Sequence, residues 1–331
     1  MKRTIYVLSL LVCIMFISIS CGKSKSSELD SIKVAYLADF AGTSAAAIAQ
    51  EKGFFKEENL EVELAKFLNG PAEVAAMLSG DIQFAYIGHG AHSLAIQGKV
   101  NILFPNGLSK SEQIIAGKWA KINKISDLRG KTVGTQLGTS GDIVLDIALR
   151  REGLRKNNVN VVNMDVSGIV SSMIGKKVDA VSVWAPYTFE IIKQLNDEVQ
   201  IITSITNYLD EAVFPSSWIA TPDYIKNNPD IVNRFSRAIL KAMDYRDANM
   251  DEAVEIVAKL NGTPADSVSA EKETAIWFTS NDIKKAYSDG SAERWYEAQQ
   301  KIFINSEVIK EPVNVSDYVR FDLIDSLFNI N

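Results

Sequence analysis

The sequence predicts an α/β protein with two lobes, each built on a mainly parallel sheet flanked by helices. Two observations indicate this class. Short runs rich in β-branched residues alternate with helical stretches from residue 31 onward, which is the pattern of βαβ units. The same pattern then starts again near residue 132. At 331 residues, the chain is long enough for two such domains.

The first half is predicted to alternate four strands with three helices. The run IKVAYL carries no charge after Lys33, as a buried strand requires. A hydroxyl at Thr43 or Ser44 is expected to cap the next helix, and Pro71 is expected to begin the one after it. Glycines end all three helices. The strands are expected at 32–37, 60–64, 82–88 and 100–104, and the helices at 45–52, 72–79 and 91–97.

The second half repeats this order. Thr139 or Ser140 is expected to cap its first helix, in the place that Thr43 or Ser44 takes in the first half. The succession of helix, glycine and strand also recurs, with DIQFAYIG in one half and VDAVSVWAP in the other. The two halves therefore resemble one unit used twice. The strands are expected at 132–136, 159–164 and 178–184, and the helices at 141–152 and 168–174.

The chain beyond about Pro222 is predicted to be helical. Residues 228–249 place apolar side chains on one face at helical spacing. These side chains are Ile231, Val232, Phe235, Ile239, Leu240 and Met243. A helical tail of this kind is expected to pack back onto one of the two lobes.

The first 20 residues are interpreted as a signal peptide. Lys2 and Arg3 precede an apolar run at 5–19, which is shorter than the roughly 20 residues that span a membrane. The run leads to Ser20 and Cys21, which resemble the lipobox of bacterial lipoproteins, although Ser18 departs from its preferred aliphatic residue. The resemblance implies lipidation of Cys21 and a polar tether at 21–29. An ordinary signal peptide is the alternative.

Composition excludes several classes of function. A hydrophobic content of 47% with a net charge of −6 describes a soluble globular protein. Because no basic run is present, binding to nucleic acid is not expected. The two cysteines, Cys13 and Cys21, lie in and directly after the leader, so no disulfide or zinc framework is predicted.

Five segments together resemble the nitrate/sulfonate/taurine family of ABC-transporter solute-binding proteins, within the NMT1/THI5-like periplasmic-binding-protein superfamily. The resemblance runs from about residue 32 to 245. The segments are AIAQEKGFFKEENLEVEL (47–64), AAMLSGDIQFAYIG (75–88), ISDLRGKTVGTQLGTSGDIVLDIALRREGL (125–154), GKKVDAVSVWAPY (175–187) and NPDIVNRFSRAILKAM (228–243).

This resemblance implies a two-lobed periplasmic-binding-protein fold of type II-like form. Two hinge crossovers, near 111–118 and 214–221, would join the lobes. Lobe I is then expected at 30–113 plus 222–331, and lobe II at 114–221. The resemblance also implies partners, namely an ABC permease and its ATPase, and a location outside the cytoplasm with a lipid anchor in the cell membrane.

The cleft is expected to hold its ligand at two helix N-termini. The helices that follow Thr43 and Thr139 begin where strands end, and ligands of open α/β sheets bind at that edge. Free N–H groups and the helix dipole there favour a small anion. Gly138 lets the backbone approach closely, and the hydroxyl of Ser140 adds a donor. Two ordinary helix caps are the alternative.

Further ligand contacts are expected at both lips of the cleft. The family resemblance places Trp184 where it packs on the ligand or closes the cleft, although a buried structural tryptophan is the alternative. Asp39 and Phe40 occupy the other lip, where the aspartate pairs with an amine of the solute or simply caps the loop. The remaining expected contacts are Gly88, His89 and, in the return crossover, Ser217.

Neither metal, cofactor nor catalysis is predicted. The only histidines, His89 and His92, fall short of the three or four ligands of a typical zinc site. Gly130-Lys131-Thr132 ends like a P-loop, but residue 125 is isoleucine where that motif needs glycine. No nucleophile–base signature stands out.

The predicted function is capture of a small organic anion, such as a sulfonate, taurine or nitrate, for an ABC importer. Within the same class, the alternative is a thiamine-type pyrimidine precursor. An enzyme or a solute sensor on the same fold is the alternative from another class.

Overall fold

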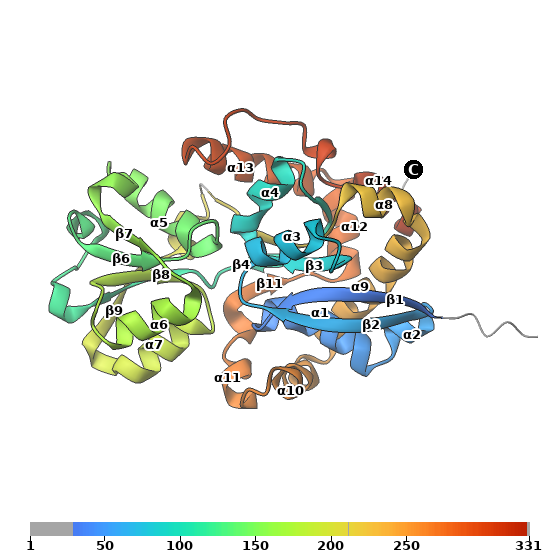
Figure 1. Cartoon of the computed structure of the whole chain (residues 1–331), viewed down its shortest axis with the longest axis horizontal. Helices are drawn as coiled ribbons and strands as arrows, with labels where there is room; N and C mark the ends of the chain where they lie inside the picture. Colours follow the sequence, from blue (N-terminus) through green and yellow to red (C-terminus); the bar gives the residue numbers. More distant parts are fainter. Residues whose placement is uncertain (1–28, 211, 330–331) are drawn as a thin grey trace, which may run out of the picture.

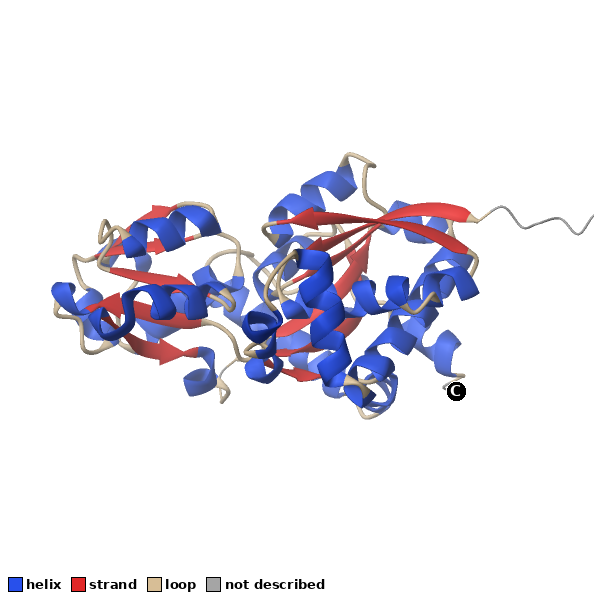
Figure 2. Ribbon diagram, turned by 90° about the horizontal axis from the view of Figure 1, so that it is seen from below, coloured by secondary structure: helices blue, strands red, loops and turns tan. Residues whose placement is uncertain are grey.

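The computed structural model describes residues 29–210 and 212–329. The predicted signal peptide, Cys21 and nearly all of the predicted tether lie outside these residues. Figure 1 shows two α/β lobes side by side, and Figure 2 shows helices on both sides of the strands in each lobe. The predicted fold class is therefore confirmed.

Lobe I contains a sheet of six strands in the order β11-β4-β10-β3-β1-β2. Strands β1, β2 and β3 are parallel, whereas β10 runs antiparallel to both β3 and β4. The strands are β1 (Asp30–Leu37), β2 (Leu60–Phe67), β3 (Phe84–Ile87), β4 (Asn101–Ser109), β10 (Pro215–Ala220) and β11 (Ala275–Trp277).

Lobe II contains a sheet of five strands in the order β7-β6-β8-β5-β9. Here β5 is the antiparallel strand, between β8 and β9. Its place matches that of β10 in lobe I, so the five strands of lobe II follow the order of the lobe I strands other than β11, and the predicted repetition is confirmed. The strands are β5 (Gln113–Gly117), β6 (Thr132–Thr135), β7 (Asn160–Asn163), β8 (Ala180–Val183) and β9 (Val199–Ser204).

Helices and short 3₁₀ turns connect the strands. The α-helices are α1 (Phe40–Glu51), α2 (Phe54–Glu57), α3 (Gly70–Leu78), α4 (His92–Ile96), α5 (Ser140–Arg151), α6 (Val166–Ile174), α7 (Tyr187–Leu195), α8 (Pro222–Asn227), α9 (Pro229–Ala248), α10 (Met250–Asn261), α11 (Ala265–Ser269), α12 (Ser280–Ser288), α13 (Ser291–Asn305) and α14 (Phe321–Phe328). The 3₁₀ turns are η1 (His89–Ala91), η2 (Lys118–Ala120), η3 (Ile125–Leu128), η4 (Lys156–Asn158), η5 (Asn196–Glu198), η6 (Ile205–Tyr208), η7 (Lys272–Thr274) and η8 (Val315–Asp317).

The chain crosses between the lobes twice. The first crossover is residues 110–112, between β4 and β5, close to the predicted position. The return lies between β9 and β10. Because β10 pairs within the lobe I sheet, lobe II ends before Pro215 rather than at residue 221, and the predicted boundary moves accordingly.

The helical tail packs mainly onto lobe I, as Figure 1 shows. Helices α9 and α10 lie against α1. The ring of Phe235 in α9 stacks on Phe84 in β3, with 3.8 Å between the ring centroids. The apolar face predicted for residues 228–249 is therefore the face that covers the sheet.

The start of α1 differs from its prediction. The helix begins at Phe40, and its N-cap is Asp39, whose carboxylate accepts the Gly42 N–H at 2.7 Å. The expected caps Thr43 and Ser44 are wrong, because both lie inside the helix and are fully buried. In α5 the N-cap is Thr139 as predicted, but its hydroxyl makes no capping bond.

Candidate functional site

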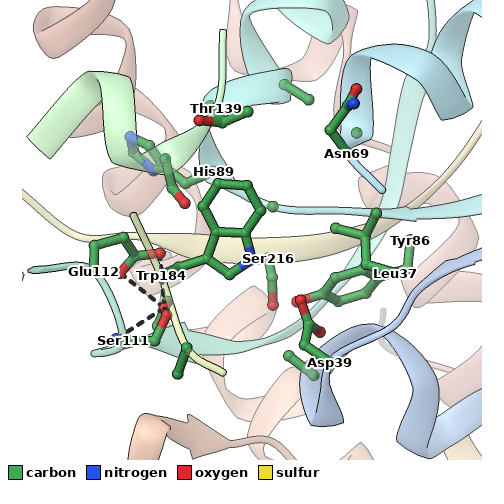
Figure 3. Close-up of a pocket in the computed structure, with 18 of the residues that line it drawn as sticks. Leu37, Asp39, Asn69, Tyr86, His89, Ser111, Glu112, Thr139, Trp184 and Ser216 are labelled. Carbon is green, nitrogen blue, oxygen red and sulfur yellow. Dashed lines mark hydrogen bonds between the residues drawn. The ribbon is translucent and has the colours of Figure 1, made fainter. Parts of the chain in front are cut away.

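A pocket lies between the two lobes, at the carboxyl ends of their strands. It encloses about 670 Å³ of space free of protein atoms, its open mouth included. Lobe I contributes Asp39, Asn69 and Tyr86, and lobe II contributes Thr139 and Trp184. The first crossover also reaches the pocket, and Figure 3 shows side chains from all these elements around one space.

Seven of the ten predicted contact residues line this pocket. They are Asp39, Gly88, His89, Gly138, Thr139, Ser140 and Trp184. In each lobe, the residues that follow a buried strand or begin the next helix converge at the same edge of the sheet. This is the geometry that the strand and helix pattern predicts.

The other three predicted residues lie outside the pocket lining. Phe40 is fully buried and packs edge-on against Trp277. The hydroxyl of Thr43 donates to the Leu37 carbonyl at 2.8 Å. Ser217 shares a hydrogen bond of 3.0 Å with the Tyr296 hydroxyl, within lobe I. Since successive side chains of a strand point to opposite faces, it is Ser216 that faces the pocket instead.

The lining is acidic. Asp39, Glu112 and Glu271 all face the pocket, and each is more than nine-tenths buried. Among the described residues, no lysine or arginine lines it. Two of these carboxylates were not predicted as site residues, namely Glu112 in the first crossover and Glu271 in the helical tail. Neither belongs to a motif, so only the tertiary structure identifies them.

The N-terminus of α1 is already occupied by the protein's own carboxylates. Asp39 accepts the Gly42 N–H, and Glu271 accepts the Phe40 N–H at 2.8 Å. The Thr43 N–H bonds the Asp39 carbonyl. The N–H groups of Phe40 and Gly42 are therefore not free for an anion, whereas the N–H of Ala41, which lines the pocket, has no acceptor among the described residues.

Burial raises the pKa of these carboxyl groups. The pKa of Asp39 rises to about 6, chiefly through burial, although hydrogen bonds from Gly42 and from the Trp184 indole oppose the rise. Burial and the nearby charge of Asp39 raise the pKa of Glu271 to about 8. Burial also raises the pKa of Glu112. Glu73, fully buried in α3 behind the lining, has a pKa raised well above its ordinary value by burial and by Asp39.

Trp184 joins the two lobes at the centre of the pocket. It follows β8 in lobe II, and its indole N–H faces the Asp39 carboxylate of lobe I. In Figure 3 the indole lies between His89 on one side and Asp39 on the other. The residue is only 7% exposed and lines the pocket from the lobe II side.

A hydrogen bond and ring stacking fix the position of the His89 side chain. Its Nδ1 accepts a hydrogen bond of 2.9 Å from the Gln299 amide, and the same amide lies 2.7 Å from Nδ1 of His92. The His89 ring stacks on Phe214, with 3.6 Å between centroids. Burial lowers the pKa of both histidines, so both are neutral. Within the described ranges, no group of three or more His, Cys, Asp or Glu side chains is placed to hold a metal ion.

The N-terminus of α5, the second helix end predicted to hold the ligand, makes different hydrogen bonds from the N-terminus of α1. Its first residue, Ser140, donates to Glu112 across the crossover. The Thr139 hydroxyl donates to the Gln136 carbonyl at 2.7 Å. Asp142, one turn into the helix, accepts the Gly138 N–H and pairs with Lys156. Both hydroxyls at this helix end are thus engaged within the chain, and the Asp142 carboxylate there is paired with Lys156.

The lobes touch beside the pocket. A Cβ added to Gly90 of lobe I would lie 2.2 Å from the carbonyl carbon of Thr139 in lobe II. On the far side of α5, the Ser306 hydroxyl donates to Asp146 at 2.5 Å. Both contacts join separate lobes, so the lobes are in direct contact on two sides of α5.

Comparison with known proteins identifies relatives along most of the chain. A family model described as NMT1/THI5 like matches residues 42–253. A binding protein of Brucella abortus (strain 2308) is 33% identical over 291 residues, which cover 88% of this chain and 90% of the relative. The taurine-binding periplasmic protein of Escherichia coli (strain K12) is 28% identical over 236 residues, covering 67% of this chain and 71% of the relative.

The fold is also found among solved structures. The periplasmic nitrate-binding protein NrtA from Synechocystis PCC 6803 superimposes with a TM-score of 0.73 at 13% sequence identity. The match covers 92% of this chain and 90% of that protein. At this identity, the likeness concerns the two-lobed fold.

Proposed function

The chain belongs to the NMT1/THI5-like family, and from this premise we propose that it is the solute-binding component of an ABC importer. The observation that carries the proposal is the pocket, whose walls come from both lobes and from the first crossover. Because the walls belong to different lobes, the shape of the pocket can change with the angle between the lobes.

Binding would work by shifting an equilibrium between open and closed forms. Only the closed form brings Asp39 of lobe I and Trp184 of lobe II to the same solute. A solute that contacts both residues binds the closed form more tightly and so increases its population. The permease would then recognise the closed form and receive the solute.

The cargo in this proposal is a small organic solute of the sulfonate or taurine class. The name of the E. coli relative supports this class. The N-terminus of α5 supports it as well, because Ser140 lines the pocket and the first N–H groups of a helix have no acceptor within the helix. A thiamine-type pyrimidine precursor is the second candidate, because Asp39 lines the pocket and can accept hydrogen bonds from an aromatic amine.

The proposal includes a lipid anchor at Cys21, outside the cytoplasm. Replacing the acceptor sulfur in Cys21→Ser is expected to release the protein from the membrane fraction while leaving solute binding unchanged. Retention of the variant in the membrane fraction would contradict the anchor. Across residues 29–210 and 212–329, no helix combines the length and apolar composition needed to cross a membrane.

A thermal-shift screen tests the binding function. A solute that binds only the folded protein raises the melting temperature, with about 2.7 kcal/mol of added stability at 100 times its Kd. We expect at least one sulfonate, aminosulfonate or pyrimidine to give such a rise, without conversion of the solute to a product. Turnover would instead indicate an enzyme. A flat response to these solutes and to a wide metabolite panel would refute solute binding.

A further inference from the structure

The charge of the pocket narrows the class of solute. Asp39 and Glu271 lie side by side at the start of α1, because they accept the N–H groups of Gly42 and Phe40 in the same helical turn. Each of these carboxylates uses one oxygen for that bond. The second oxygen of Glu271 has no hydrogen-bond partner in the described part of the chain, although the side chain is 96% buried and lines the pocket.

Within residues 29–210 and 212–329, no lysine or arginine lines the pocket to balance these carboxylates. The buried guanidinium of Arg246 does not line the pocket. It donates hydrogen bonds to Ser44, Asn106 and the Phe278 carbonyl instead. Glu112 adds a third carboxylate on the opposite wall. Carboxyl groups held together away from water keep their protons more strongly, and Glu271 does so up to a pKa of about 8. An anionic solute would oppose their ionisation further, whereas a cationic solute would favour their ionised forms.

The aromatic residues of the lining are compatible with the same ligand. The Trp184 indole covers the pocket from lobe II, and Tyr86 lies beside Asp39 in Figure 3. The faces of both rings attract a cation within about 6 Å. The carboxylates of lobe I can accept hydrogen bonds from an ammonium or amidinium group, and the indole of lobe II can contact the same group through its ring face.

We infer that the pocket selects its solute by a positively charged, N–H-bearing nitrogen, which Asp39 and Glu271 bind from lobe I while Trp184 covers it from lobe II. The inference rests on the proposed function, since it names the chemical group that this same pocket recognises. An aliphatic ammonium and a protonated amino-heterocycle share this chemistry. Either can be joined to a polar or anionic group at the Ser140 wall.

Matched pairs of solutes test the inference by isothermal titration calorimetry on the purified protein. The first pair is taurine and ethanesulfonate, and the second is 4-amino-2-methylpyrimidine and 4-hydroxy-2-methylpyrimidine. In at least one pair, the amino compound is expected to bind at least about tenfold more tightly, because charged hydrogen bonds contribute most of the difference. The pair that shows the preference distinguishes an aliphatic from an aromatic amine.

A conservative variant then links the preference to the carboxylate. Glu271→Gln keeps an oxygen for the Phe40 N–H but cannot ionise when a cation binds, so it is expected to weaken binding of the preferred amine by about tenfold or more. The matched control is Glu273→Gln, the same change two residues away on an exposed side chain outside the pocket, which should bind as the wild type does.

Three results would overturn the inference and leave the proposed function standing. The first is equal or tighter binding of the amine-free member in every pair that binds. The second is a tightly binding solute in the wider panel that has no cationic nitrogen, and the third is an amine preference that Glu271→Gln leaves unchanged. If no solute of the pairs or of the wider panel binds, the proposed function itself fails, and the inference fails with it.

Discussion

Closure of the lobes should depend on the absence of a side chain at Gly90. This residue lies in η1 of lobe I, against the backbone of Thr139 in lobe II. A Cβ at this position would lie 2.2 Å from the Thr139 carbonyl carbon, 2.5 Å from its oxygen and 2.6 Å from its Cα. These are backbone atoms, so no rotation of a side chain relieves the overlap. We expect Gly90→Ala to hold the lobes apart.

The size of the effect follows from these distances. Carbon atoms pack at about 3.5 Å or more, so the Gly90→Ala contact requires the lobes to separate locally by roughly 1.3 Å. A hydrogen bond of about 2.9 Å across the cleft would then lengthen to about 4.2 Å, beyond hydrogen-bonding range. If two such bonds to the solute are lost, at about 1–1.5 kcal/mol each, the Kd should rise roughly 30- to 140-fold.

Calorimetry with the tightest solute from the screen measures the change in Kd, and small-angle X-ray scattering measures closure directly. Gly90→Ala should keep the larger radius of gyration of the open form even when the solute is saturating. Its free energy of unfolding should change little, because the overlap lies between lobes and not within one. Gly134→Ala in β6 is the control, since its added Cβ would meet its nearest atom at an ordinary 3.4 Å. Wild-type affinity and normal compaction in Gly90→Ala would refute the reasoning.

Three further predictions concern single side chains. Trp184→Phe keeps a ring but removes the N–H that faces Asp39, so the Kd measured by calorimetry should rise about 5- to 10-fold; unchanged affinity would exclude that contact from binding. The pKa of Glu271 is raised to about 8 from 4.5, so its contribution to stability is complete below pH 4.5 and is lost as the pH rises through 8. Urea denaturation between pH 5 and 9 should therefore show the wild type losing up to a few kcal/mol relative to Glu271→Gln, at about 1.4 kcal/mol per pKa unit, whereas parallel curves would contradict this. Arg246→Leu should lower the free energy of unfolding by about 2–4 kcal/mol, because buried oxygens lose a charged donor; a loss below about 0.5 kcal/mol in urea would show that the lobe I core does not need it.

Much of the architecture could be predicted because it depends on local pattern. The strand predicted at 32–37 lies within β1, and the helix predicted at 141–152 is nearly all of α5. Glycines that end helices and apolar runs of strand length act over a few residues, so they are visible in the sequence. The repetition of the two halves was visible for the same reason.

Errors of one to four residues had larger consequences at the site. The helix predicted to begin after Thr43 begins at Phe40, because the carboxylate of Asp39 caps it first. That shift commits two N–H groups at the helix start, those of Phe40 and Gly42, to carboxylates of the chain itself. Likewise, Ser217 was predicted in place of Ser216, and a difference of one residue in a strand exchanges the pocket face for the lobe interior.

The sequence by itself determined the α/β class, the repeated two-lobed plan and the strand ends where the pocket lies. Only the tertiary structure decided the charge of that pocket. Glu271 reaches the N–H of Phe40 from 231 residues away along the chain, and Glu112 enters from a crossover whose path depends on both sheets. Periodicity and capping act between near neighbours, whereas the electrostatic field in a cleft is the sum over segments that folding brings together. A pattern of helices and strands therefore locates the cleft, but it cannot specify which sign of charge the cleft favours.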